Sequence, residues 1–251
     1  MKIANEQFES ACSAMYNRLV DFMLEKIDLN RVSTVLEAGC GSGRLTIPLA
    51  ERGGEKWVVI AYDLFMGSYK KSLEILRETI QKKDLDHIVK IIIGDVRNMK
   101  GIKNETVDLI VSNELFCDLD LHGLETTLLE FYRILRFKGQ MVHAELVSIP
   151  ENKAQEFFIK ADYSYSLETM TLQPEWFSPS ADEVATLLHK TGFTKINVNY
   201  FETNLKLNFN AALKRLKEWN VDPSFTTTYE KELRRYGLEF PMEHVISCEK
   251  I

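Results

Sequence analysis

The sequence predicts an α/β fold with a doubly wound, mostly parallel sheet. Between residues 33 and 148, short apolar segments alternate with amphipathic segments that have helical spacing. This alternation is typical of a parallel sheet covered by helices on both faces. In addition, the first apolar segment runs directly into a glycine-rich turn at residues 39–43. In open parallel sheets a ligand crevice borders such turns.

Length and composition fit one globular domain over residues 1–251. Apolar residues make up 45% of the chain, enough for a sizeable core, and the net charge is −6. An acidic chain is a poor general ligand for nucleic-acid phosphates, so nucleic acid is disfavoured as a partner. The four cysteines lack metal-ligand spacing, and we expect free thiols and no metal site. We find no signal peptide and no apolar span of ~20 residues, and therefore expect a cytoplasmic protein without membrane contact.

The first elements follow from spacing and from glycine. Apolar residues from Phe8 to Ile27 recur every three or four positions, which predicts an amphipathic helix that covers the core as part of residues 1–30. Thr34–Ala38 is expected to form a buried strand. Residues 44–52 are expected to form a helix that ends at Gly53-Gly54, with Pro48 removing one backbone hydrogen bond.

The same reasoning extends to the rest of the chain. Strands are expected at 57–62, 88–93, 107–112, 140–148, 193–201 and 242–248. Helices are expected from Met66 to Ile80, from Leu124 to near Gly139, over 181–191, from Phe209 to Leu216, and over a charged stretch at 226–235. Two segments, about 149–180 and 203–240, lie outside the core alternation of residues 33–148. They are candidate lid segments on the substrate side.

Polar residues stand where the predicted strands end. Glu37 lies two residues before Gly39, and Asp63 ends the second strand 20 residues after Gly43. Asp95 ends the third strand and Asn113 the fourth. Because the carboxyl ends of parallel strands border the crevice, these side chains are candidates for one site. There, Asp63 could accept both hydroxyls of a ribose, and Asp95 a hydrogen bond from an adenine amino group.

These residues resemble the class I S-adenosylmethionine-dependent methyltransferases, in particular small-molecule methyltransferases of the type 11 kind. The matching pieces are Val35–Gly43, Asp63, Gly94–Val96, Asp108–Asn113 and Glu130–Gly139, with a weaker match over 177–193. The resemblance implies a Rossmann-like, seven-stranded sheet whose last strand is antiparallel. It also implies methyl transfer from S-adenosyl-L-methionine, with S-adenosyl-L-homocysteine as the product.

The resemblance further implies which residues bind this cofactor. They are Glu37, Gly39, Cys40, Gly41, Gly43, Asp63, Leu64, Asp95, Val96 and Asn113. The backbone of residues 39–43 would hold the methionine end, and Glu37 would orient the loop or the amino group. Asp63 would bind the ribose and Asp95 the adenine, with Leu64 and Val96 as apolar walls. The main-chain carbonyl of Asn113 would lie near the amino group.

The acceptor side is less defined. The family often has a second glycine where Gln140 stands, and many small-molecule members have a histidine where Asp118 stands. No catalytic residue is therefore assigned. His143 and Glu145 alternate on one strand and are expected to share a face, with one of them a candidate to border the pocket and His143 more typical of a core histidine. The segment 151–191 has an excess of acids, which would disfavour anionic acceptors if it lined that pocket.

Several alternatives remain open. A nicotinamide dinucleotide is disfavoured because Arg44 occupies the position of the third fingerprint glycine. The segment 113–116 lacks the Asn-Pro-Pro-Tyr type of motif carried by amino-group methylators of DNA bases and protein glutamines. A small-molecule acceptor is therefore favoured over a protein or RNA. A protein that binds S-adenosylmethionine without catalysis, as a regulator or scaffold, is a further alternative. The oligomeric state is not predicted.

Overall fold

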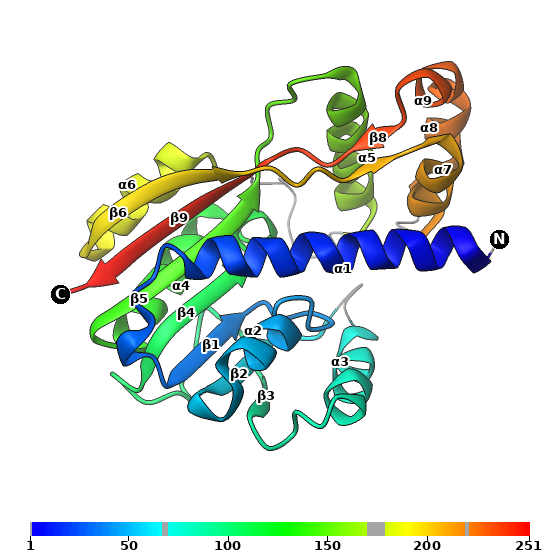
Figure 1. Cartoon of the computed structure of the whole chain (residues 1–251). Helices are drawn as coiled ribbons and strands as arrows, with labels where there is room; N and C mark the ends of the chain where they lie inside the picture. Colours follow the sequence, from blue (N-terminus) through cyan, green and yellow to red (C-terminus); the bar gives the residue numbers. More distant parts are fainter. Residues whose placement is uncertain (1, 67–69, 170–178, 219–220) are drawn as a thin grey trace.

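The computed structural model describes all residues except 1, 67–69, 170–178 and 219–220. Its main sheet consists of β1 (Thr34–Ala38), β2 (Val58–Asp63), β3 (Val89–Ile93), β4 (Val107–Asn113), β5 (Leu135–Leu146), β6 (Phe193–Phe201) and β9 (Glu243–Lys250). The strand order is β3-β2-β1-β4-β5-β9-β6 (Figure 1). The pairs from β3 to β5 are parallel, whereas β9 is antiparallel to both β5 and β6. The predicted seven-stranded, doubly wound sheet with an antiparallel last strand is confirmed.

Helices cover both faces of this sheet, and a further group of helices lies beyond the ends of its strands (Figure 1). They are α1 (Lys2–Leu24), α2 (Thr46–Gly53), α3 (Ser72–Lys82), α4 (Leu121–Ile134), α5 (Lys153–Thr169), α6 (Ala181–Thr191), α7 (Phe209–Glu218), α8 (Pro223–Thr228) and α9 (Glu230–Tyr236). The short strands β7 (Lys206–Leu207) and β8 (Leu238–Glu239) form a separate antiparallel pair. Among the described residues, no helix combines the length and apolarity needed to cross a membrane.

Alternate residues of each strand enter different halves of the core. Val35 of β1 packs in a cluster with residues of α1, α2 and α3, whereas Leu36 packs in a second cluster with residues of α4 and α6. Leu109 and Ile110 of β4 divide in the same way. Because both faces are covered, the strands are apolar almost throughout, which is why sequence patterning located them well.

The segments at about 149–180 and 203–240 form one helical group. Their helices α5, α7, α8 and α9 lie together on the side toward which the arrows of β1, β4 and β5 point (Figure 1). Phe158 of α5, Leu216 of α7 and Leu233 of α9 belong to the same core cluster as α1. Residues 170–178 of the first segment lie outside the described residues.

Three helix predictions were wrong in their limits. The helix expected to reach Gly139 ends at Ile134 because Leu135 already pairs with Val107 as part of β5. The helix expected from Met66 begins at Ser72 instead. There, Phe65 adopts a φ of 51° and its N–H donates to Asp63, which turns the chain away from a helical path.

The third correction concerns the charged helix expected over 226–235. It is two helices, α8 and α9, because Tyr229 has φ −107° and ψ 18° between them. By contrast, Pro48 lies in the first turn of α2. Proline is well tolerated there, because N–H groups of a first turn lack a partner within the helix.

Candidate functional site

The loop between β1 and α2 depends on glycine at three positions. Gly39, Gly41 and Gly43 have φ values of 74°, 48° and 86°, in the region that other residues rarely adopt. A Cβ on Gly43 would lie 2.5 Å from Cδ1 of Leu76. A Cβ on Gly41 would meet no atom of the described residues within 4 Å. This side of the loop therefore faces open space, where a ligand can approach the backbone.

Asp63 lies beside this loop at the end of β2. Its Oδ2 accepts a hydrogen bond from the Gly41 N–H at 2.8 Å, and its Oδ1 accepts one from the Phe65 N–H at 2.7 Å. The carbonyl of Tyr62 accepts from the N–H groups of Gly39 and Cys40, at 2.9 and 3.2 Å. The two predicted site segments are thus joined directly. Each Asp63 oxygen keeps a lone pair for a further donor.

Glu37 is buried beneath the same loop. Its side chain accepts a hydrogen bond from the Thr46 hydroxyl at the start of α2. Burial raises the pKa of Glu37 to about 8, the nearby charge of Asp63 adds to this rise, and the Thr46 hydrogen bond opposes it. These contacts connect β1 to α2 and hold the loop in place. A contact of Glu37 with an amino group remains a prediction.

Asp95 has a partner that the sequence did not predict. Its carboxylate accepts hydrogen bonds from the backbone N–H of Arg97 at 2.8 Å and from the Arg97 guanidinium at 2.6 Å. This ion pair holds the pKa of Asp95 below its usual value. Of the two predicted apolar walls, Val96 is buried and Leu64 is partly exposed. An adenine amino group would have to share Asp95 with Arg97.

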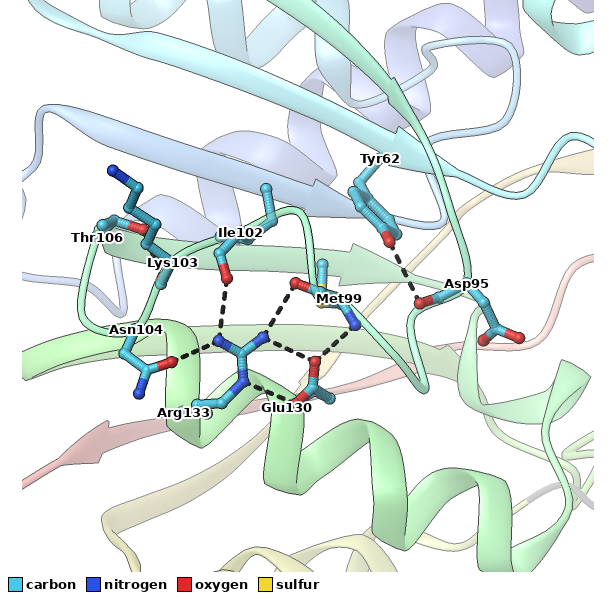
Figure 2. A network of polar contacts seen from close by, with 9 residues as sticks. All are labelled: Tyr62, Asp95, Met99, Ile102, Lys103, Asn104, Thr106, Glu130 and Arg133. Carbon is cyan, nitrogen blue, oxygen red and sulfur yellow. Dashed lines mark hydrogen bonds and ion pairs between the residues drawn. The ribbon is translucent and has the colours of Figure 1, made fainter.

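A polar network fixes the loop that carries Asp95 and Val96, as Figure 2 shows. Arg133 of α4 donates to the carbonyls of Met99 and Ile102, both at 3.0 Å, and to Oε1 of Glu130 at 2.7 Å. Glu130 in turn accepts from the Met99 N–H at 2.6 Å. Arg133 and Glu130 both lie in the matching stretch 130–139, and the structure assigns them a positioning role.

Asn113 ends β4 at the same edge of the sheet. Its side-chain amide donates to the carbonyl of Ala144 at 3.1 Å and to Oε2 of Glu243 at 2.7 Å. The side chain of Asn113 therefore connects β4 to β5 and β9. The predicted contact of its main-chain carbonyl with an amino group stays a prediction.

His143 and Glu145 share one face of β5, as predicted. Nε2 of His143 lies 3.4 Å from Oε2 of Glu145, and Nδ1 of His143 lies 2.9 Å from the Ser112 hydroxyl. Glu145 also accepts from the N–H groups of Phe116 and Cys117 at 3.1 and 3.2 Å. Burial lowers the pKa of His143 to about 3, so this histidine is neutral at pH 7.

Four more acids lie in the region of Glu145. They are Glu114 after β4, Asp118 in the next turn, Asp162 on α5 and Glu243 at the start of β9. Burial raises the pKa of Glu114, Asp118, Glu145 and Asp162 each to about 7, and repulsion by neighbouring carboxylates adds to the rise for Glu114, Asp118 and Asp162. Sequence reasoning did not bring these acids together, because they come from separate elements. Glu114, Glu145 and Glu243 lie at or near strand ends, whereas Asp162 lies within α5 and gave no such signal.

A cavity of about 210 Å³ adjoins the glycine loop. Tyr16, Gly43 and Arg44 contribute to its wall. The Arg44 guanidinium lies 5.2 Å from the centre of the Tyr16 ring, within the range of a cation–π contact. Glu37, Asp63 and Asp95 do not line this cavity, which extends between α1, α2 and α3. Among the described residues, no group of His, Cys, Asp and Glu side chains is arranged to hold a metal ion.

Comparison with known proteins agrees with this geometry. Residues 35–139, which include the glycine loop, Asp63, Asp95 and Asn113, match the family model of the methyltransferase domain. Over these residues the chain is therefore similar to a methyltransferase domain. The resemblance inferred from the sequence is thus confirmed. No curated protein sequence matches the chain.

Solved structures share the fold of the methyltransferase domain over nearly the whole chain. The YcgJ protein of Bacillus subtilis has a TM-score of 0.67 and 13% identity, with coverage of 92% of this chain and 97% of that one. Geranyl diphosphate C-methyltransferase of Streptomyces coelicolor has a TM-score of 0.59 and 16% identity, with coverage of 93% and 76%.

A third similar structure is larger than this chain. Phosphoethanolamine N-methyltransferase 2 of Haemonchus contortus has a TM-score of 0.62 and 14% identity, and the match covers 93% of this chain but 52% of that one. Its structure contains phosphomonomethylethanolamine and S-adenosylhomocysteine, and the Streptomyces structure contains Mg²⁺, geranyl-S-thiolodiphosphate and S-adenosylhomocysteine. At these identities the likeness establishes the fold.

Proposed function

We propose that this protein is an S-adenosylmethionine-dependent methyltransferase that acts on a small molecule. The observation that carries the proposal is the contact between Asp63 and Gly41. It holds a carboxylate beside Gly41, where an added Cβ would meet no atom of the described residues within 4 Å. A carboxylate at the end of the second strand is suited to a ribose diol, and an open glycine backbone to the adjoining methionine.

The surrounding residues fit an adenosyl group with a charged methionine end. Val96 offers a buried apolar surface next to Asp95, which suits a purine ring. Arg44 lies at the other end of the glycine loop, where its guanidinium is suited to a carboxylate. Glu37 keeps the loop in position between these ends. The structures of proteins with the same fold that hold S-adenosylhomocysteine support this assignment.

When bound, S-adenosylmethionine supplies a methyl group on a sulfonium that is already activated. The acceptor's nucleophilic atom forms a bond to the methyl carbon while the C–S bond breaks and leaves its electron pair on sulfur. The protein must therefore align the acceptor, exclude water and, for some acceptors, take up a proton. We assign the covering role to α1 and to the helical group of α5, α7, α8 and α9. In this assignment residues 33–148 bind the cofactor.

The small-molecule acceptor rests on two supports. The stretch after β4, residues 113–116, lacks the Asn-Pro-Pro-Tyr type of motif. Two proteins of the same fold are named for small acceptors, geranyl diphosphate and phosphoethanolamine. A screen of small metabolites with labelled S-adenosylmethionine tests whether the acceptor is a small molecule. Label in a protein or RNA fraction, with none in small molecules, would contradict it.

The donor site is tested by calorimetry with S-adenosylhomocysteine. Asp63→Ala is expected to weaken binding by about 1.5–3 kcal/mol, the scale of a hydrogen bond to a charged group. Asp63→Asn should retain part of the affinity because its amide oxygen still accepts one hydrogen bond. Asp86→Ala, at an exposed position between α3 and β3, is the control. Unchanged affinity in folded Asp63→Ala would show that the ribose is placed wrongly.

Two alternatives have direct tests. A dehydrogenase would bind NADH, which a fluorescence titration detects. A regulatory or scaffold protein would bind S-adenosylhomocysteine but transfer no label from S-adenosylmethionine to any acceptor in cell extract. Transfer to a small molecule, together with no response to NADH, supports the proposal against both.

A further inference from the structure

Five carboxyl groups surround the region next to the donor site, and we call them the acidic wall. They belong to Glu114, Asp118, Glu145, Asp162 and Glu243. The wall is built from the ends of β4 and β5, the turn at residues 116–118, α5 and the start of β9. Because β9 is antiparallel to β5, Glu243 pairs with Leu146 and reaches the same edge of the sheet. One sheet edge thus carries acids from several distant parts of the chain.

The acidic wall adjoins the glycine loop. Leu115, next to Glu114, lies against Gly39, so that a Cβ on this glycine would come within 3.0 Å of its side chain. Arg44, which follows the glycine loop, interacts electrostatically with Glu114, and Asp63 does so with Asp118. A molecule held by the wall would therefore lie beside a methyl donor held by the loop.

Three of the five wall residues are both enclosed and reachable, whereas Glu145 and Glu243 are buried. Glu114 and Asp162 are half-buried, and Asp118 is exposed. Even so, surrounding protein disfavours their charged forms and raises the pKa of each to about 7. Side chains that water can touch but that protein surrounds are expected at the wall of a cavity rather than on a convex surface. The carboxyl groups are thus positioned to meet a ligand.

A buried oxygen in this wall has no partner. Glu243 is fully buried, and Oε2 of its carboxyl accepts from Asn113, but Oε1 has no hydrogen bond among the described residues. Its electrostatic neighbours include Glu114 and Glu145. Buried polar atoms are almost always paired, so this oxygen indicates a ligand that brings a hydrogen-bond donor or positive charge.

The charges around the wall favour a cation. Arg44 and Arg215 both act on Glu114, whereas the charges that act most on Asp118 and Asp162 are those of other acids. Among the described residues, other titratable groups that face the wall include Cys12, Tyr16, Asp63, Cys117 and His143, and His244 lies beside His143. Of these, the two histidines are held neutral by burial. When ionised, the wall therefore carries more negative charge than the two arginines compensate, which attracts cations and repels anions.

We propose that the acidic wall binds the methyl acceptor and that this acceptor is a small amine, which enters as its ammonium ion. The proposal rests on the function proposed above and names its substrate class. An ammonium supplies both the positive charge and the N–H donors that the wall lacks. Carboxylates close to the sulfonium would also stabilise the positive charge that passes from sulfur to nitrogen during transfer.

The chemical step balances with one wall carboxylate as proton acceptor. The N–H bond of the ammonium breaks and its proton passes to the carboxylate, which frees the nitrogen lone pair. This pair forms the bond to the methyl carbon while the C–S bond breaks and its electrons remain on sulfur. The products are a methylated ammonium, a thioether and a neutral carboxyl group. A carboxyl group with a pKa near 7 accepts this proton more readily than an ordinary exposed one.

The first experiment measures binding in the presence of saturating S-adenosylhomocysteine. The cationic probe is 3,3-dimethylbutan-1-amine, which is protonated at neutral pH, and 3,3-dimethylbutan-1-ol is its uncharged isostere. We expect the amine to bind at least about tenfold more tightly, which corresponds to one charge-assisted contact. Its affinity should rise between pH 6 and 8, because protons must leave the wall before a cation binds. Calorimetry in buffers with different ionisation enthalpies should show this proton release.

Two variants test whether the acids of the wall cause this binding preference and the proton release. The double variant Asp118→Asn, Asp162→Asn should lose most of the preference for the amine and most of the proton release. Asp182→Asn, an exposed acid on α6, should keep both. Affinity for S-adenosylhomocysteine should stay unchanged in both proteins. If the double variant instead loses affinity for S-adenosylhomocysteine, the acids serve the donor and the proposal is wrong.

A transfer assay completes the test. Labelled S-adenosylmethionine is incubated with amines, alcohols and carboxylic acids that have matched carbon skeletons, and label is expected on amines. Donor binding with label only on alcohols or acids, or with no preference for the amine over its uncharged isostere, overturns the amine proposal and leaves the proposed function standing. Absence of donor binding would instead contradict the proposed function itself, so the two failures are distinct.

Discussion

Glu37 couples its ionisation to folding, because its carboxyl group is buried beneath the glycine loop. Its pKa is about 8 in the folded protein, against 4.5 for the free side chain. Between these two values the folded state holds a proton that the unfolded state has lost, so the stability contributed by Glu37 falls as pH rises. Glu37→Gln should remove this loss. Its stability relative to wild type should increase by up to about 1.4 kcal/mol per pH unit between pH 5 and 8.

Urea unfolding at several pH values measures this difference. Glutamine keeps an oxygen that can accept the hydrogen bond from Thr46, so the loop should keep its shape. Glu125→Gln, at an exposed position on α4, is the matched control and should follow wild type. A Glu37→Gln variant whose relative stability does not change with pH would mean that Glu37 is already ionised in the folded state.

Sequence reasoning placed the glycine loop beside Asp63, as the structure shows, but it did not bring the acids of the acidic wall together. Gly39, Gly41, Gly43 and Asp63 were found because strand, turn and acid follow one another within about 30 residues and because the fold brings adjacent strand ends together. The ion pair between Arg97 and Asp95 was missed because it depends on side-chain conformation, which sequence patterning does not show. The wall was missed because Glu243 joins it only through the antiparallel β9. His143 and Glu145 were found, since strand alternation places them on one face.

At the scale of elements, α4 positions a loop that it does not belong to. Arg133→Met would remove the hydrogen bonds to Met99, Ile102 and Glu130 shown in Figure 2. We expect the unfolding free energy to fall by about 1–3 kcal/mol and the affinity for S-adenosylhomocysteine to fall as well. Hydrogen exchange over residues 94–106 should become faster.

Arg136→Met is the control for this prediction. Arg136 also pairs with an acid, Asp108, at 2.6 Å, but Asp108 bonds to Ser33 and Thr34, at the opposite edge of the sheet from the glycine loop. This variant should lose stability without loss of ligand affinity. If both variants bind S-adenosylhomocysteine with equal affinity, Arg133 does not position the loop for ligand binding.

Strand positions were predicted well, and helix ends were predicted less well, for physical reasons. Buried parallel strands must be apolar along their length, so their sequence shows them directly. A helix end depends on tertiary partners. The pairing of Leu135 with Val107 ends α4 five residues before Gly139. Gln140, where the family often has glycine, instead exchanges two hydrogen bonds of 3.0 Å with the backbone of Asp28. Such contacts between distant segments are not encoded in local patterning.

At the scale of the molecule, α1 connects the two parts of the fold that the sequence pattern separates. It contacts α2 and β5 of the cofactor-side core and α7 of the helical group. The buried residues of all three regions form one continuous cluster. We therefore expect the N-terminal helix and the helical group to unfold together with the sheet as one cooperative unit rather than to detach as a separate lid.

Leu19→Ala tests this expectation, since Leu19 is fully buried on α1 within that cluster. Loss of a buried leucine should lower the free energy of unfolding by about 2–5 kcal/mol. If the unit is cooperative, hydrogen exchange in the protected amides of α1 and of β4 should accelerate by the same factor, because both then exchange through the same global opening. Leu129→Ala, where the side chain is 60% exposed on α4, should leave both rates nearly unchanged. Faster exchange confined to α1 would show instead that this helix opens by itself, and that access to the donor loop is controlled by the N-terminal helix alone.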